Sequence, residues 1–209
     1  MDASTREDLS RLREIAEQGR RMPLLGGWHL ILWGGAMTLA LLINWAVEER
    51  ILAWPGWSLA ISWFGIVLLA WAGSALLGRR KAGDPGASSV GNQVERAAWT
   101  TAGAFLLILA LALLARAALG GGGRGDWASF GLMPPATFGA YAIALQASAV
   151  AAGGASGSAR PYVLVSLAFA AATALLIGQP AQHLAAAAGI ALVAFPAGLG
   201  HIRASRRAG

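Results

Sequence analysis

The stretch that decides the fold covers residues 161–202 and reads PYVLVSLAFAAATALLIGQPAQHLAAAAGIALVAFPAGLGHI. It holds 42 residues, and none of them is Asp, Glu, Lys or Arg. Only Gly178-Gln179-Pro180 interrupts the apolar run, and Gly and Pro close together mark a tight turn. Because an apolar helix of about 20 residues crosses the hydrocarbon core of a bilayer, this stretch predicts two membrane helices joined by a turn.

Similar uncharged runs upstream bring the predicted number of membrane spans to six. Their approximate limits are residues 24–47, 51–77, 97–119, 130–152, 161–177 and 180–202. The sequence therefore predicts an all-α, polytopic membrane protein. Its membrane domain would cover residues 22–203, after a cytosolic amphipathic helix at residues 1–21 and before a basic tail at residues 204–209.

An internal repeat is a further interpretation of the same spans. Pro55, Pro135 and Pro180 each precede a glycine by 18 residues, and each opens a span that runs in the same predicted direction. Proline is well suited to the first turn of a helix. The pattern favours three helical hairpins. Coincidence is the alternative, since 28 residues of the chain are Gly.

Composition excludes several classes of protein. Of the 209 residues, 56% are hydrophobic and only 12% are charged, whereas a soluble domain carries about 25% charge. A net charge of +6 is compatible with a nucleic-acid-binding protein, but the basic residues lie at the ends of predicted spans and not on one soluble face. We therefore expect membrane lipids around the chain and no nucleic-acid partner. The absence of cysteine excludes disulfides, thiolate metal sites and iron–sulfur clusters.

The orientation follows from the positions of Lys and Arg. With the N-terminus in the cytosol, thirteen of these residues fall on the cytosolic side and three on the other. Short cytoplasmic loops carry the excess of Lys and Arg in membrane proteins. The sequence predicts a multi-pass protein of a bacterial-type inner membrane with both termini in the cytosol.

The N-terminal helix is the clearest sequence clue to a partner. Ser4-Thr5-Arg6-Glu7 fits a capping box, and Leu9, Leu12 and Ile15 form one narrow apolar stripe. Residues 4–18 carry three positive and four negative side chains, whereas a helix that binds anionic lipid is basic on its polar face. The stripe therefore predicts docking against a second copy or another protein. The alternative is a helix that lies on the membrane and only leads into the first span.

Small residues at four-residue spacing predict where helices pack closely. They recur along the fourth span and again along the sixth, where small side chains let helix backbones approach in a membrane. These positions are Ala136, Ala140, Ala144, Ser148 and Ala152 in the fourth span, and Ala181, Ala185 and Gly189 in the sixth. The neighbours would belong to the same chain or to another copy.

Two polar residues are candidate ligand contacts. Gln146 lies in the inner half of the fourth span, opposite Ala144, and would either bond a neighbouring helix or contact a ligand. His183 lies near the outer surface. The other histidines, His29 and His201, lie near the inner surface at depths that could hold a haem. Histidines at the membrane interface without any ligand are far commoner, so we expect no metal and no cofactor.

One short motif resembles an enzyme family. Gly154-Ala155-Ser156-Gly157 matches the G-x-S-G of rhomboid proteases, and six spans in a chain of this length also resemble the rhomboid core. The resemblance implies Ser156 as nucleophile and His183 as its base. The predicted topology places these two residues on opposite sides of the bilayer, whereas a serine nucleophile needs its base within hydrogen-bond reach. The sequence therefore predicts no enzyme.

The lack of charge at the centre of every predicted span bears on function. Proton-coupled and ion-coupled carriers usually place Asp, Glu, Lys or Arg at mid-membrane. We expect a non-enzymatic binding, scaffold or regulatory subunit of a membrane assembly. The first alternative is a channel or uncoupled transporter for a small neutral or apolar solute. The second is a rhomboid-like intramembrane serine protease.

Overall fold

The computed structural model describes residues 24–208, except 82, 85–86, 121–128 and 153–158. Within these limits all regular structure is helical, which confirms the predicted all-α class. The elements are α2 (Gly27–Glu48), α3 (Trp57–Lys81), α4 (Val90–Leu119), the short 3-10 helix η1 (Ser129–Leu132), α6 (Met133–Ala151), α7 (Ala159–Leu175) and α8 (Ala181–Ala208). The predicted helix at residues 1–21, with Leu9, Leu12 and Ile15, lies outside the described residues.

Four of these helices are long and apolar enough to cross a membrane, namely α2, α3, α4 and α8. Helix α7 is a shorter apolar helix. The membrane character expected from the sequence is therefore confirmed at the level of the individual helices.

Several helix limits differ from the predicted spans for local reasons. Helix α3 begins only at Trp57, because Pro55 accepts hydrogen bonds from both the backbone and the hydroxyl of Ser58 in a turn. Helix α4 begins at Val90, between the second and third predicted spans, where the Ser89 hydroxyl accepts a hydrogen bond from the backbone N–H of Asn92. Helix α8 continues through the predicted basic tail to Ala208.

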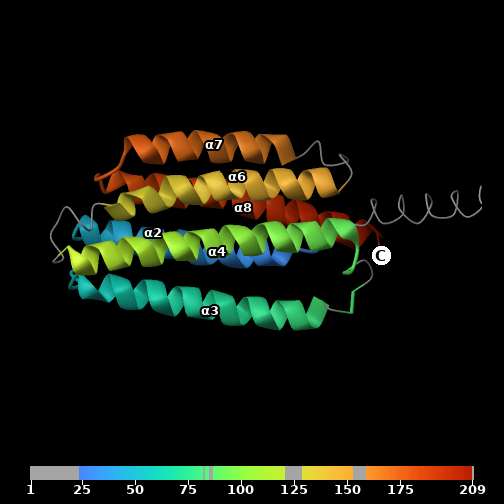
Figure 1. Cartoon of the computed structure of the whole chain (residues 1–209), viewed down its shortest axis with the longest axis horizontal. Helices are drawn as coiled ribbons and strands as arrows, with labels where there is room; N and C mark the ends of the chain where they lie inside the picture. The colour runs from blue at the N-terminus through green and yellow to red at the C-terminus, as the bar shows by residue number, and fades with distance from the viewer. Residues whose placement is uncertain (1–23, 82, 85–86, 121–128, 153–158, 209) are drawn as a thin grey trace, which may run out of the picture.

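The helices lie side by side along one long axis (Figure 1). Helix α2 packs on α3 and α8, α8 packs on α7, α7 on α6, and α6 on α4. The most extensive contact joins α2 to α8, the first and the last described helices. Helix α3 stands at the edge, because its only extensive contact is with α2 and Ala70 is its only buried residue among those described.

The core lies between α2, α6 and α8 and is apolar. Phe138 of α6 and Val193 and Ala194 of α8 are fully buried, and Leu41 of α2 packs with them. Aromatic pairs extend this core sideways. The Phe138 ring stacks on Phe169 of α7 at 5.6 Å, and Trp99 of α4 meets Tyr141 edge-on at 4.9 Å. The centre of the bundle is thus filled mostly by apolar and aromatic side chains.

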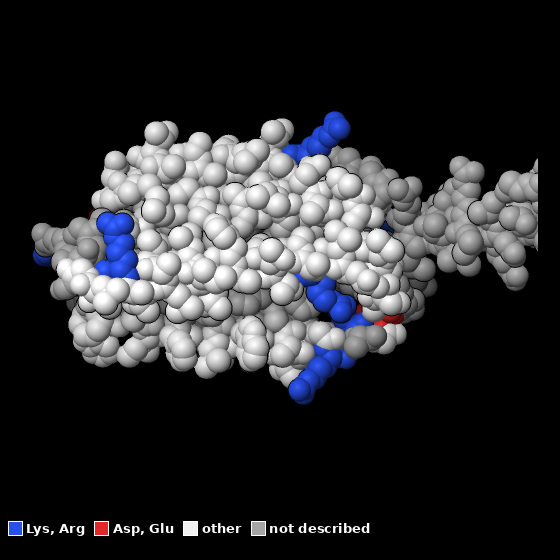
Figure 2. Space-filling model, viewed as in Figure 1, with Lys and Arg blue, Asp and Glu red and all other residues white. Residues whose placement is uncertain are grey.

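The surface is divided into charged ends and an uncharged middle. Figure 2 shows Lys and Arg gathered toward the two ends of the visible face and none across the wide zone between them. Large apolar side chains such as Phe64 and Leu69 of α3, about three-quarters exposed, cover the middle. The 22 residues of α2 span about 33 Å, close to the hydrocarbon thickness of a bilayer.

Candidate functional site

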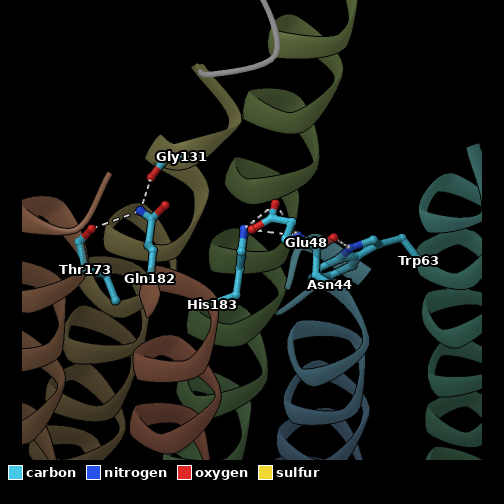
Figure 3. A network of polar contacts seen from close by, with 7 residues as sticks. All are labelled: Asn44, Glu48, Trp63, Gly131, Thr173, Gln182 and His183. Atoms are coloured by element: carbon cyan, nitrogen blue, oxygen red, sulfur yellow. Dashed lines mark hydrogen bonds and ion pairs between the residues drawn. The ribbon is translucent and has the colours of Figure 1, made fainter. Parts of the chain in front are cut away.

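Polar side chains from three helices form a network at one end of the bundle (Figure 3). We call this end, where α2 ends and α8 begins, the outer end. Asn44 Nδ2 lies 3.2 Å from Glu48 Oε1 and 3.0 Å from His183 Nε2, and Trp63 Nε1 donates to Asn44 Oδ1 at 3.2 Å. His183 Nε2 also lies 3.1 Å from Glu48 Oε1. We refer to these four residues as the outer network.

Local structure explains why these side chains meet. Asn44 and Glu48 are one helical turn apart on α2, so their side chains share one face. Trp63 comes from α3, and His183 from the first turn of α8. The Glu48 side chain is 37% exposed and that of His183 18%, so solvent reaches the network from the end of the bundle. The other imidazole nitrogen, His183 Nδ1, is buried without a hydrogen-bond partner.

The neighbouring Gln182 anchors the start of α8 from the opposite side. Its Nε2 donates to the carbonyl oxygens of Gly131 at 2.6 Å and Thr173 at 2.9 Å, as Figure 3 shows. The side chain is 2% exposed. A buried amide with two partners is a satisfied structural group, and it joins α8 to both η1 and α7.

A second polar cluster lies at the inner end, where α2 begins. The side chain of Asn92 accepts the backbone N–H of Leu25 at 2.7 Å, and Glu95 Oε2 accepts that of Gly26 at 3.1 Å. His201 Nδ1 of α8 lies 3.4 Å from Glu95 Oε1. The first N–H groups of a helix have no partner inside it, and a carboxylate also suits the positive end of its dipole. Helix α4 therefore caps the start of α2.

Gly26 is required by this cap. A Cβ atom at Gly26 would lie 2.6 Å from Glu95 Oε1 and 2.7 Å from the carboxylate carbon. The Glu95 side chain is only 5% exposed, so it has little room to move aside. On the other side, Lys81 Nζ donates to the Leu25 carbonyl at 3.2 Å and ties the end of α3 to the same point.

The structure separates the two ligand candidates. His183 belongs to the outer network, whereas Gln146 is exposed on α6 beside Ile143, five residues from the inner end of that helix. The inner histidines turn to different neighbours: His29 Nε2 lies 3.3 Å from the Ser74 carbonyl of α3, and His201 faces Glu95. Among the described residues no group of three or more His, Asp and Glu is placed to hold a metal.

Comparisons of the chain with protein-family models, with curated proteins and with solved structures find no match. The two polar clusters and the packing of the bundle are therefore the observations on which a function can be argued.

The small residues expected at helix contacts occupy three kinds of position. Ala140, Ala144, Ser148 and Gly189 are buried, and a Cβ on Gly189 would lie 2.5 Å from the Phe169 ring. Partly buried positions are Ala136, Ala152 and Ala185, and Ala181 is exposed at the start of α8. The packing of α6 is thus with neighbours in the same chain.

The serine of the rhomboid-like motif lies outside the described residues. The helix ends that flank it, at Ala151 of α6 and Ala159 of α7, lie at the opposite end of the bundle from the start of α8 (Figure 1). His183, the base in that interpretation, is engaged with Asn44 and Glu48.

Asn92, Glu95 and Gln182 were not singled out from the sequence. The first two fall in a stretch whose Gly, Ser and Asp content is typical of a loop. Their signal is the spacing: Ser89, Asn92 and Glu95 follow each other at three-residue intervals, which places them on one face of a helix that begins at Ser89.

Proposed function

We propose that the protein is a non-enzymatic binding, scaffold or regulatory subunit of a membrane assembly. It would cross a bacterial-type inner membrane six times, with both termini in the cytosol. The observation that carries the proposal is the solid apolar centre of the bundle, where Phe138, Val193 and Ala194 are fully buried. A pathway for a polar solute through a bundle needs polar groups along it.

The distribution of polar groups supports the same function. The outer network lies at one end of α2 and the Asn92–Glu95 cap at the other, and in both the groups bond to each other across helices. Groups used in this way hold helices together. The core between the two ends is mostly apolar, and its few buried polar side chains, such as Ser166, bond within their own helix.

Six crossings are supported by helix length and by packing. Helices α6 and α7 contain 19 and 17 residues, so they rise about 28 and 26 Å, close to the hydrocarbon thickness. A hairpin arrangement is supported because α2 packs on α3, α4 on α6, and α7 on α8. Two of the repeat glycines, Gly73 and Gly198, lie at close contacts with α2.

The partner would dock on the N-terminal helix through Leu9, Leu12 and Ile15. That segment joins the bundle at the inner end, where Leu24 is buried and the next two backbone N–H groups are held by Asn92 and Glu95. Helices α3 and α4 hold the described chain at this point through Lys81, Asn92 and Glu95.

The proposal is tested with Leu9→Glu combined with Leu12→Glu, in native mass spectrometry from mild detergent. We expect a folded bundle that has lost its second copy or its co-purifying partner. A matched control, Ser10→Glu with Gln18→Glu, adds the same two charges away from the stripe and should retain the assembly. A wild-type particle with one copy and no partner would overturn the proposal, and so would an assembly unchanged by the stripe variant.

A further inference from the structure

The outer network contains one nitrogen with two incompatible partners. His183 Nε2 lies 3.0 Å from Asn44 Nδ2 and 3.1 Å from Glu48 Oε1. An amide nitrogen is only a donor, and a carboxylate oxygen is an acceptor. The same imidazole nitrogen cannot accept from the first and donate to the second at one time. Whether Nε2 carries a hydrogen therefore decides which of the two bonds is made.

The orientation of the Asn44 amide is fixed by chemistry. Oxygen and nitrogen of an amide are distinguished by their hydrogen-bond partners. The indole N–H of Trp63 can only donate, so the Asn44 atom 3.2 Å away from it must be the oxygen. The amide nitrogen then faces Glu48 and His183.

We propose that His183 is a proton-operated switch that fastens the outer half of α3 to α2 when it is neutral and releases it on taking up a proton. This inference goes beyond the proposed subunit function and does not depend on it. Histidine is the side chain whose charge changes most readily near physiological pH.

In the proposed neutral state, the hydrogen of His183 resides on Nδ1, where it has no hydrogen-bond partner, and the Nε2 lone pair accepts from Asn44. Asn44 can then donate one amide hydrogen to His183 and the other to Glu48, and its oxygen accepts from Trp63. Every atom of the Asn44 amide has a partner in this state. Helices α2, α3 and α8 are joined through one side chain.

In the protonated state, a proton from solvent occupies Nε2, and the imidazolium donates to Glu48 Oε1 over 3.1 Å. The new N–H and the Asn44 amide N–H₂ would then face each other at 3.0 Å as two donors. The amide must rotate to avoid this contact. Rotation moves its oxygen away from the Trp63 indole, and the bond between α2 and α3 is lost.

Helix α3 is sensitive to the loss of this bond because, among the described residues, only the packing of Trp63 and its neighbours otherwise joins its outer half to α2. Its extensive contact is with α2 alone, and Ala70 is its only buried residue among those described. Its other side-chain hydrogen bonds to α2 are toward the inner end, where Ser74 accepts from Trp33 at 2.8 Å and contacts His29. Toward the outer end, the hydrogen bond from Trp63 to Asn44 joins α3 to α2.

The charges around His183 make Glu48 its main electrostatic partner. Directly after the end of α2, Glu49 and Arg50 carry opposite charges. Residues 57–78 of α3, the four residues of η1 and residues 184–200 of α8 contain no titratable side chain, and α7 contains only Arg160 and Tyr162, at its inner end. Arg116 of α4 lies one turn from the outer end of that helix.

The test uses the full chain in lipid nanodiscs, with ¹⁵N-labelled histidine, between about pH 8 and about pH 5. Nitrogen chemical shifts distinguish the two neutral tautomers from the imidazolium. We expect His183 as the Nδ1–H tautomer at the higher pH and as the imidazolium at the lower pH. Over the same interval, amide hydrogen exchange should rise several-fold in residues 57–66 of α3 and stay constant in residues 67–78.

The variant His183→Gln supplies the decisive comparison. A glutamine oxygen accepts from Asn44 at every pH, so exchange in residues 57–66 should no longer depend on pH. The control variants Glu49→Gln and His29→Gln should keep the wild-type response. An Nε2–H tautomer of His183 at the higher pH, or a pH response that persists in His183→Gln, would overturn the proposal.

Discussion

Gly27 of α2 and Gly198 of α8 meet backbone to backbone. A Cβ on Gly27 would lie 2.6 Å from the Gly198 carbonyl oxygen, and a Cβ on Gly198 would lie 2.7 Å from that of Gly27. Further along the same interface, a Cβ on Gly34 would lie 2.5 Å from the Cβ of Ala194. Lipid tails are as apolar as the helices, so such close packing is a main source of helix association in a membrane.

The first prediction concerns this glycine pair. Gly198→Ala should destabilise the protein by about 1–3 kcal/mol, because its methyl group meets a carbonyl oxygen that cannot move without moving α2. The thermal midpoint of unfolding in detergent measures the effect. At Gly200, two residues away on the same helix, a new Cβ meets no atom within 4 Å, so Gly200→Ala should be neutral or slightly stabilising. Equal midpoints for the two variants would contradict the close contact.

A second prediction addresses the small residues of α6. Ala144 and Ser148 are 1% and 2% exposed, so Leu at either position forces neighbouring helices apart at a cost of about 1–3 kcal/mol. Ile143 points outward and is 73% exposed, so Ile143→Leu should have little effect. The comparison is made by thermal unfolding. If all three variants unfold together with the wild type, the stripe does not face the interior.

The third prediction concerns the amide that anchors α8. Gln182→Leu removes the donor to the Gly131 and Thr173 carbonyl oxygens and leaves two acceptors without that partner in a buried place. Such a loss costs about 1–3 kcal/mol. Gln179→Leu, at an exposed position in the preceding turn, is the control. Chemical or thermal unfolding that fails to separate the two variants would show that the amide contributes nothing.

The fourth prediction is the topology. The chain contains no cysteine, so single cysteines can be introduced without any background. Residues 1–21, residues 79–95 and the C-terminus should react with an impermeant maleimide only from the cytosolic side. Position 123 should react only from the other side. Labelling of position 123 from the cytosol alone would reverse the orientation that the Lys and Arg positions predict.

The helices could be predicted because an uncharged apolar run of about 20 residues is typical of a membrane-spanning helix. Their limits were less predictable. Helix α4 begins seven residues before the predicted span, because Ser89 caps it and Asn92 and Glu95 are buried against the start of α2. Polar residues in a stretch rich in Gly and Ser favour a loop by composition. A helix is favourable there because Asn92 and Glu95 bond the start of α2, which is distant in the sequence.

The candidate sites could be predicted only in part. His183 was selected from its place near a predicted span end, and it does lie in a polar network. Asn44 and Trp63 were not predicted to belong to this network, since nothing in the local sequence says that α2, α3 and α8 meet at that depth. Gln146 and Gln182 look alike in the sequence, yet one is exposed and the other is 2% exposed. Burial depends on which face meets a neighbour, and that is a property of the assembled bundle.

The pairing of α2 with α8 sets an order of events during synthesis. Asn44 is separated from His183 by 139 positions, so at about 5–20 residues per second the ribosome takes on the order of ten seconds to supply the partner. Until then the glycines of α2 face lipid and the Asn44 amide has no imidazole to bond. A nascent chain halted before residue 181 would therefore leave this face of α2 without the helix that covers it in the complete bundle.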